Sequence, residues 1–215
     1  MPLATLLVLA DGRFPAGGHA HSGGLEAAAA DGSVRDLASL GAFLGGRLRT
    51  AGLVTAALAA ASAAPGADLA RLDAETDART PSPAQRKASR QLGRHLVRTA
   101  RAAWPGPTWA AVPPGPHHAV ALGVTVLAAG LQPSAAALVA ASSSISGSAT
   151  AAVRLLGLDP MAVTGLLADL AGEVDRVAAE ATRAATAGDL PALSGPLLDI
   201  GAELHATWEV RLFAS

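Results

Sequence analysis

The segment from His117 to Ala129 constrains the fold of this chain more than any other stretch. Read as a helix, it is apolar on every side, and a helix of that kind must be covered by neighbouring elements over its whole circumference. Gly130 follows it, which is the residue preferred just beyond a helix end. We therefore expect a core built around one central, buried helix.

The side chains available to cover that helix are small and aliphatic. Hydrophobic residues make up 51% of the 215 residues, but aromatic residues make up only 3%, and tyrosine is absent. Such a composition suits closely packed helices better than a sheet, which is enriched in β-branched and aromatic residues. The length fits one domain. We predict an all-α fold, a single-domain helical bundle of about eight to ten helices spanning residues 1–215.

Apolar spacing and capping residues place the individual helices. Ser33 with Asp36, Ser82 with Pro83 and Gln85, Ser134, and Asp159 with Pro160 are expected to begin helices. The first helix is expected to be short and buried. The predicted helical segments are 3–10, 25–30, 37 to about 64, part of 67–80, 83–103, 117–129, 134–156, 160 to about 187, and about 197–212.

A glycine-rich polar loop separates the first two helices. Residues 11–26 include five glycines and one proline, and they carry Asp11, Arg13, His19, His21, Ser22 and Glu26. A P-loop is excluded because it needs a lysine after its last glycine, and the single lysine is Lys87. A serine-hydrolase elbow is disfavoured because the G-x-S-x-G pattern and its preceding strand are both missing. The loop is best interpreted as a docking site for protein partners.

Histidines are the remaining candidates for metal ligands, because the chain has no cysteine. His19 with His21, and His117 with His118, could in principle bind nickel or zinc. We favour exposed or hydrogen-bonded histidines and assign no metal ligand. A histidine-based nickel carrier stays open as an alternative.

Charge is strongly segregated along the chain although the net charge is only −1. Residues 78–158 contain eight basic residues and no acidic one, whereas residues 159–215 contain nine acidic and three basic residues. Within the basic third, Arg86, Arg90, Arg94 and Arg98 recur every four residues and so share one helix face. Three interpretations of this row stay open. It is a solvated face, it pairs with acidic residues of 159–215, or it binds an acidic partner molecule. A basic-helix nucleic-acid-binding protein is the disfavoured alternative, since no nucleic-acid motif is present.

No apolar run reaches the roughly 20 residues that span a bilayer, and 119–131 comes nearest. A signal peptide has basic residues before its apolar region, and no basic residue precedes the apolar run at 3–10. We expect a soluble, cytoplasmic protein that contacts no membrane.

Several motifs, in order along the chain, resemble those of the UreF family of urease accessory proteins. The first is Leu6-Leu-Val-Leu-Ala-Asp11 with Arg13-Phe-Pro-Ala-Gly-Gly-His-Ala-His-Ser-Gly-Gly-Leu-Glu26, and the last is His205 with Arg211-Leu-Phe-Ala-Ser215. Between them, the sequence Arg86-Lys-Ala-Ser-Arg-Gln-Leu-Gly-Arg94, the sequence His118-Ala-Val-Ala-Leu-Gly123 and the pair Arg154-Leu155 are similar to family segments.

This resemblance implies an all-helical, non-catalytic chaperone for nickel insertion into apo-urease. Proteins of this family bridge UreD (also called UreH) and the GTPase UreG on the apo-urease subunits, and they are typically dimeric there. They are thought to regulate the GTPase step. No cofactor is expected to be bound tightly, since nickel is handled by the assembled complex, and no nucleic acid is involved.

The matched polar positions are the candidate partner-binding residues that the resemblance implies. They are Asp11, Arg13, His19, Ser22, Glu26, Arg86, Ser89, Arg94, Arg154, His205 and Arg211. Some of them are expected to be structural: Ser89 by bonding to its own helix, and His205 or Arg211 by pairing with an internal acid. By the same resemblance, residues 211–215 are a candidate for contacting UreD.

Overall fold

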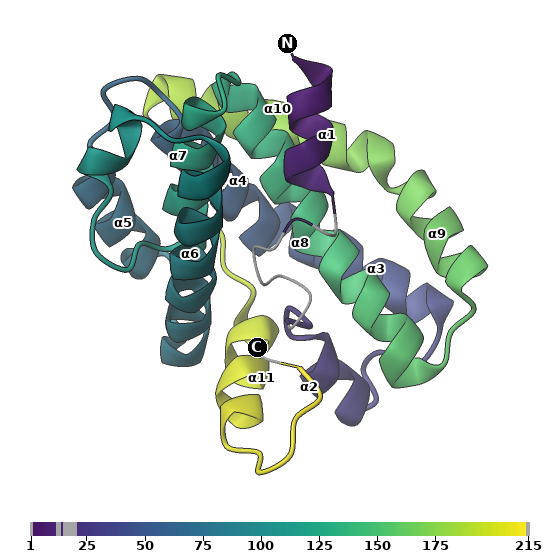
Figure 1. Cartoon of the computed structure of the whole chain (residues 1–215). Coiled ribbons are helices and arrows are strands. Elements are labelled where there is room, and N and C mark those ends of the chain that lie inside the picture. Colours follow the sequence, from purple (N-terminus) through teal and green to yellow (C-terminus); the bar gives the residue numbers. More distant parts are fainter. Residues whose placement is uncertain (1, 12–13, 15–20, 214–215) are drawn as a thin grey trace.

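The fold was taken from a computed structural model, in which residues 2–11, 14 and 21–213 are described. Those residues form helices and connecting loops and no β-strand, so the predicted all-α class is confirmed (Figure 1). The helices are α1 (Leu3–Ala10), α2 (Leu25–Ala30), α3 (Leu37–Arg47), α4 (Leu53–Ser62), α5 (Leu69–Ala78), α6 (Pro83–Ala103), α7 (His118–Ala128), α8 (Pro133–Leu156), α9 (Pro160–Asp169), α10 (Ala171–Ala187) and α11 (Pro196–Ala206).

The core lies where α4, α7, α8 and α10 pack against one another, with α6 covering α7. Helix α7 is the predicted central helix, since its residues from Ala119 to Val126 are all buried. The core side chains are alanine, leucine and valine almost throughout, as the composition indicated. Small side chains let the helix backbones approach closely, and this is what makes a dense core possible with so few aromatic residues.

Two glycines mark the closest helix approaches. A Cβ atom added at Gly123 of α7 would collide with the carbonyl oxygen of Ala59 on α4. A Cβ atom at Gly93 of α6 would collide with the carbonyl oxygen of Pro116, which lies just before α7. Each obstacle is backbone, which cannot rotate away as a side chain can. Both positions therefore require glycine for packing.

Of the four predicted helix caps, two are confirmed and two are wrong. Ser82 accepts a hydrogen bond from the Gln85 amide, and Asp159 caps α9. Helix α3, however, is capped by Asp36, whose side chain accepts from the Ser39 amide, and not by Ser33. Helix α8 begins at Pro133 after Gln132, without a side-chain cap from Ser134. In both cases the N-cap residue, Asp36 for α3 and Gln132 for α8, lies within three residues of the predicted one.

The long predicted helices are interrupted. A π-helical turn at 48–52 separates α3 from α4, and Leu170 divides the segment from 160 to 187 into α9 and α10. The last helix was predicted to reach about residue 212 but ends at Ala206, so residues 207–212 lie beyond it. The chain then folds back toward α2 (Figure 1).

The first helix differs from its predicted burial. Helix α1 lies against α8, and Leu9 is its buried residue, but Leu3 and Leu7 are 64% and 70% exposed. An apolar run alone does not tell a buried helix from one that leaves a hydrophobic face uncovered.

Helix α8 is the one described helix that is long and apolar enough to cross a membrane, although no such run was expected. More than half of its apolar window is buried inside the fold, where it packs against α4 and α10. Burial of this kind is typical of a core helix, so the length and composition of α8 are weak support for a membrane span.

Candidate partner-binding site

The buried carboxylate of Glu26 joins the two ends of the chain. Its oxygens accept hydrogen bonds from the backbone N–H groups of Leu212 and Phe213, at 2.8 and 2.9 Å. The Nε2 atom of His205 lies 2.9 Å from the same carboxylate. We call these four residues the C-terminal clasp. Helix α2 supplies the acceptor, α11 supplies the imidazole, and the segment after α11 supplies the two amides.

The clasp keeps Glu26 ionised. Burial raises the pKa of a carboxyl group, but hydrogen bonds from Leu212, His205 and Phe213 outweigh that effect and hold the pKa of Glu26 below its ordinary value. Charge-assisted hydrogen bonds in a buried setting are among the stronger polar contacts of a protein. The clasp therefore fixes where the C-terminal segment lies.

The end of the glycine-rich loop is held by hydrogen bonds to Glu26, to α3 and to α8. Ser22 is fully buried, its Oγ accepts from the Glu26 amide, and its carbonyl accepts from Ser148 of α8. The Arg47 guanidinium donates to the carbonyls of Gly23 and Ser144, each at 2.7 Å. Burial lowers the pKa of Arg47 to about 10. These contacts tie the loop to α3 and α8, and so position Glu26.

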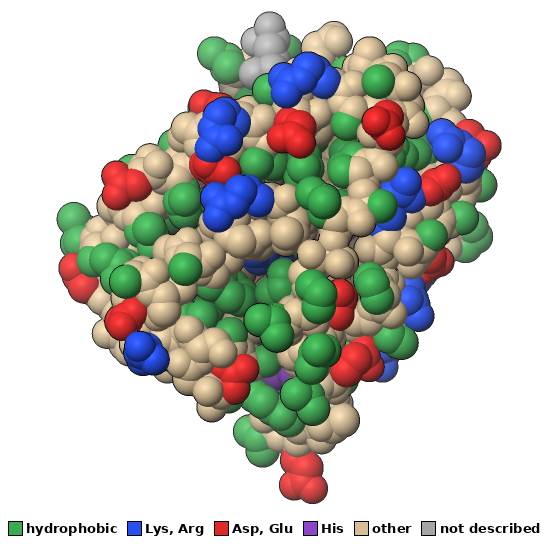
Figure 2. Space-filling view, turned by 180° about the vertical axis from the view of Figure 1, so that it is seen from behind, with side chains coloured by type: hydrophobic (Ala, Val, Ile, Leu, Met, Phe, Trp, Pro, Cys, Tyr) green, Lys and Arg blue, Asp and Glu red, His purple; other side chains and the backbone are tan. Residues whose placement is uncertain are grey.

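Helix α11 presents an apolar face that the chain itself does not cover. Leu197, Ile200 and Leu204 are 84%, 55% and 59% exposed, and their spacing places them on one side of the helix. Val210 and Leu212 continue this surface beyond the helix, with exposures of 82% and 74%. We call these five residues the α11 apolar face. Figure 2 shows hydrophobic side chains gathered on the lower part of the molecule, at the height of α2 and α11.

The arginine row of α6 divides into an engaged half and an exposed half. Arg90 donates to Asp73 at 2.9 Å and to Asp77 at 2.5 Å, both on α5. Arg86 donates to the carbonyls of Thr80 and Pro81. The expected internal partner thus exists, but it comes mainly from α5 and not from residues 159–215. Arg94 and Arg98 are exposed, and neither pairs with a carboxylate among the described residues.

Asp73 and Asp77 also hold His117, which is completely buried. Asp73 accepts from the His117 amide at 2.8 Å, and Asp77 lies 2.8 Å from His117 Nε2. The ligand atoms of these three residues lie within 4.8 Å of one another, as in a metal site. The Arg90 guanidinium already supplies the positive charge at both carboxylates, however, so we interpret the cluster as a polar network between α5, α6 and α7.

Ser89 belongs to this network. Its hydroxyl lies 3.0 Å from His117 Nδ1 and accepts from the His118 amide at 3.1 Å. The expectation that Ser89 bonds to its own helix is therefore wrong: the hydroxyl fixes the start of α7. The His117 ring is hydrogen-bonded to Asp77 and Ser89, which is the interpretation favoured for the histidines over a metal shared by His117 and His118.

The remaining candidates lie at the surface or outside the described residues. Arg154 and Arg211 are exposed, and the Arg154 guanidinium lies 5.9 Å from the centre of the Phe213 ring. Asp11 is half-buried. Arg13 and His19 lie outside the residues that the structure describes. Ser22, Glu26 and His205 are buried, so they position the C-terminal segment, and the pairing of His205 with an internal acid is confirmed.

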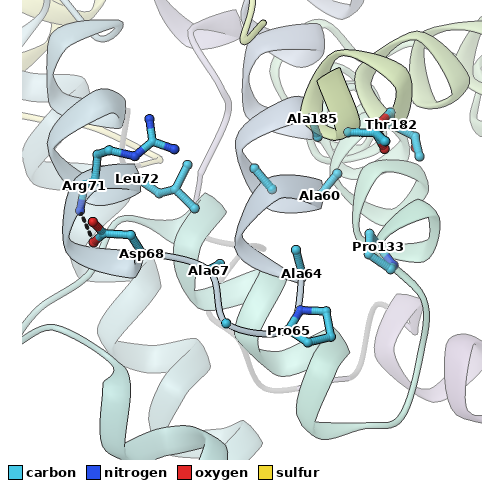
Figure 3. A pocket seen from close by; sticks show the side chains of 13 residues that line it. Ala60, Ala64, Pro65, Ala67, Asp68, Arg71, Leu72, Pro133, Thr182 and Ala185 are labelled. Atoms are coloured by element: carbon cyan, nitrogen blue, oxygen red, sulfur yellow. Dashed lines mark hydrogen bonds between the residues drawn. The ribbon is translucent and has the colours of Figure 1, made fainter. Parts of the chain in front are cut away.

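Two hollows lie on the described surface. One, of about 230 Å³, is bounded by the end of α4, the start of α5, Pro133 and α10 (Figure 3). Alanine is the commonest residue of its walls, and the Asp68 carboxylate in it accepts the hydrogen bond that caps α5. The other, of about 210 Å³, lies between the glycine-rich loop, α6, α7 and the segment before α11, and it is lined by His21, Arg47 and His118.

Comparison with known proteins identifies the family of this chain. The model of the UreF family matches residues 34–171. A urease accessory protein UreF from Mycolicibacterium vanbaalenii is 52% identical over 216 residues, which cover 99% of each chain. The chain belongs to the UreF family.

Other UreF proteins agree over the same length. The one from Mycobacterium marinum is 52% identical over 215 residues, and the one from Mycobacterium tuberculosis H37Rv is 48% identical over 213 residues, each covering 99% of both chains. The family resemblance seen in the motifs is therefore confirmed. Because UreF proteins are urease accessory proteins, this chain is placed in urease maturation.

Sequence reasoning did not find the clasp or the network at the start of α7. Glu26 and His205 are 179 positions apart, and no local pattern joins them. Asp73 and Asp77 did carry a signal, since two acids four residues apart can face two arginines four residues apart on the next helix. The larger number of acidic residues in 159–215 favoured that segment as the expected partner of the arginine row.

Proposed function

We propose that this chain acts as a non-catalytic scaffold and GTPase regulator in nickel insertion into urease, bridging UreD (UreH) and the GTPase UreG on apo-urease in the cytoplasm. Membership of the UreF family supports the place in urease maturation. The bridging, the regulation of GTP hydrolysis, the homodimer within the complex and the handling of nickel by the whole assembly go beyond that membership.

The α11 apolar face is the observation that carries the bridging proposal. Exposed leucine and isoleucine side chains next to one another are unfavourable in water, and contiguous patches of this kind mark protein-binding surfaces. The patch is continuous with residues 211–213, part of the segment that the family resemblance assigns to UreD. We therefore assign the α11 apolar face to UreD.

The clasp gives this surface a defined shape. Glu26 and His205 fix the path of the chain after α11, because the Leu212 amide and the His205 ring bond to the same carboxylate. A surface that is ordered before binding loses less conformational entropy on association. The clasp thus serves binding without its buried residues touching the partner.

The exposed half of the arginine row provides a second, separate surface. Arg94 and Arg98 lie on α6 without carboxylate partners among the described residues, and an acidic surface of a protein partner would complement them. Two distinct surfaces are what a bridging scaffold needs.

Urease activation in cells tests the proposal. The complete urease gene set is expressed with and without this chain, and urease activity and nickel content are measured. The proposal predicts inactive, nickel-poor urease without the chain and recovery when the chain is supplied. Full activity without it would contradict the proposal.

A further inference from the structure

Ser89, His117 and Asp77 form a continuous chain of hydrogen bonds that the scaffold function does not use. The hydroxyl oxygen of Ser89 lies 3.0 Å from His117 Nδ1, and His117 Nε2 lies 2.8 Å from Asp77 Oδ1. The imidazole is completely buried, whereas Ser89 is half-buried and lines the cavity of about 210 Å³. A serine, an imidazole and a carboxylate in this order are the parts of an activated nucleophile, which is recognised by geometry and not by sequence position.

We infer that Ser89 is an acyl-accepting serine, at which an activated ester of a short carboxylic acid modifies this chain covalently. The acyl group stays on the serine, so the site is a modification site and lies beyond the proposed scaffold function. A strand-to-helix elbow is not needed here. Helix α6 places the serine, and the residue that precedes α7 supplies the imidazole.

The hydrogen bonds determine which groups donate and which accept. Burial raises the pKa of Asp77, but hydrogen bonds from His117 and Arg90 outweigh that effect and hold the pKa below its ordinary value, so the carboxylate only accepts. Burial lowers the pKa of His117, and its ring is therefore neutral at pH 7. It follows that Nε2 carries the hydrogen directed at Asp77. The lone pair on Nδ1 is then free to accept the proton of Ser89.

Acylation at this site is a balanced substitution at the carbonyl carbon of the ester. Ser89 Oγ forms a bond to that carbon, and the hydroxyl proton passes to His117 Nδ1. The leaving oxygen departs with the electron pair of the broken C–O bond and then takes the proton from the imidazolium. The imidazolium is stabilised in the meantime because Nε2 is bonded to Asp77 and a second carboxylate, that of Asp73, lies close by, although Arg90 also contacts both carboxylates.

The first turn of α7 supplies donors for the negative charge that develops during the attack. The His118 amide donates to Ser89 Oγ at 3.1 Å, which stabilises charge on that oxygen. The amides of Ala119 and Val120 have no acceptor in the part of the chain that the structure describes, and Ala119 lines the cavity. Amides at a helix N-terminus are oriented to bind anions, so these two are suited to the acyl oxygen.

The cavity beside Ser89 limits the size and polarity of the acyl group. Its walls include Ala51, Val54, Leu92 and Leu198, which would contact an acyl chain through apolar atoms. Sites for drug-sized ligands have volumes of roughly 300–1,000 Å³. At about 210 Å³ this cavity is smaller, and it therefore favours a short acyl chain.

Incubation of the purified full-length chain with p-nitrophenyl acetate tests the inference, and a fluorophosphonate is a second probe that selects activated serines. Peptide mass spectrometry measures which residues are modified and how fast. Ser89 should be acetylated about 100-fold or more faster than the exposed Ser33, because a positioned general base gives an acceleration of that order. Ser89→Ala should abolish labelling by the fluorophosphonate, whereas Ser33→Ala should leave it unchanged. His117→Gln should slow the acetylation of Ser89 to the rate of Ser33, and circular dichroism shows whether each variant is folded.

A second readout covers the case in which His117→Gln does not fold. In the unaltered chain, the imidazole nitrogen resonances of His117 should show hydrogen on Nε2 and a lone pair on Nδ1, and acetylation of Ser89 should shift the Nδ1 resonance. Acetylation of Ser89 no faster than that of Ser33, an unchanged rate in a folded His117→Gln variant, or hydrogen on Nδ1 would overturn the inference. Neither readout involves urease or UreD, so failure here leaves the proposed scaffold function untouched, and the reverse also holds.

Discussion

The Nε2 atom of His205 lies 2.9 Å from the carboxylate of Glu26, so two residues 179 positions apart bond the last helix to the second. The same carboxylate receives the amides of Leu212 and Phe213. One buried side chain therefore sets the position of the C-terminal segment. Changing it should alter that segment before it alters the rest of the fold.

Glu26→Gln keeps the shape of the side chain but removes the charge and one acceptor. We expect a loss of about 1–3 kcal/mol in the free energy of unfolding, because a buried donor is left without its charged partner. Hydrogen exchange at the amides of Leu212 and Phe213 should speed up more than exchange in α7. Glu209→Gln, at an exposed position, is the matched control and should change neither quantity. Equal protection of both amides in the two variants would contradict a clasp.

The glycine at the crossing of α6 and the start of α7 gives a packing prediction. Gly93→Ala forces a methyl group into the carbonyl oxygen of Pro116, so we expect destabilisation of about 1–3 kcal/mol. Gly46→Ala is the control, because a Cβ atom there meets nothing within 4 Å and alanine favours a helix by about 1 kcal/mol. Chemical denaturation should therefore move the two midpoints in opposite directions. A Gly93→Ala variant as stable as the unaltered chain would refute the close approach.

The network at the start of α7 predicts that the carboxylate of Asp73 contributes more to the free energy of unfolding than an exposed carboxylate does. Asp73→Asn removes the charge that Arg90 and the His117 amide share, so the free energy of unfolding should fall by about 1–3 kcal/mol. Asp175→Asn, on the exposed side of α10, should cost much less. If both variants melt at the same temperature, the network is not a stabilising contact.

The buried imidazole of His118 makes stability depend on pH. Its folded pKa, about 4, lies below the unfolded value of 6.5, so the unfolded chain binds the extra proton. The contribution is fully present above pH 6.5 and is lost as the pH falls toward 4, by up to about 3 kcal/mol. His118→Leu should flatten the stability profile between pH 6.5 and 4. An unchanged slope in that variant would exclude His118 as the cause.

The sequence predicted the helices well where the signal was local. Ser82-Pro83 and Asp159-Pro160 began helices as expected, and the apolar segment after His117 is the buried centre of the core. Motif resemblance predicted the family. The less successful predictions depended on which face of a helix is covered, as for Leu3 and Leu7 of α1, and on contacts between distant segments.

The candidate site shows the same limit. Motif matching selected Glu26 and His205 but said nothing of their contact, and it gave buried and exposed residues the same role. Burial inside the chain separates Ser22, Glu26 and His205, which position the C-terminal segment, from Arg94, Arg154 and Arg211, which are free to meet a partner. That distinction arises from tertiary packing, which the sequence of one chain does not display.

Co-purification with UreD is the measurement that tests the central claim most directly. The unaltered chain and a Leu197→Ser, Ile200→Ser, Leu204→Ser variant are each co-expressed with UreD and UreG, with Met161→Ser, at an exposed residue of α9, as the control. We predict that the unaltered chain and the control retain UreD, and that the triple variant loses it while keeping its helical spectrum. Retention of UreD by the folded triple variant, or its absence from the unaltered chain, would contradict the claim.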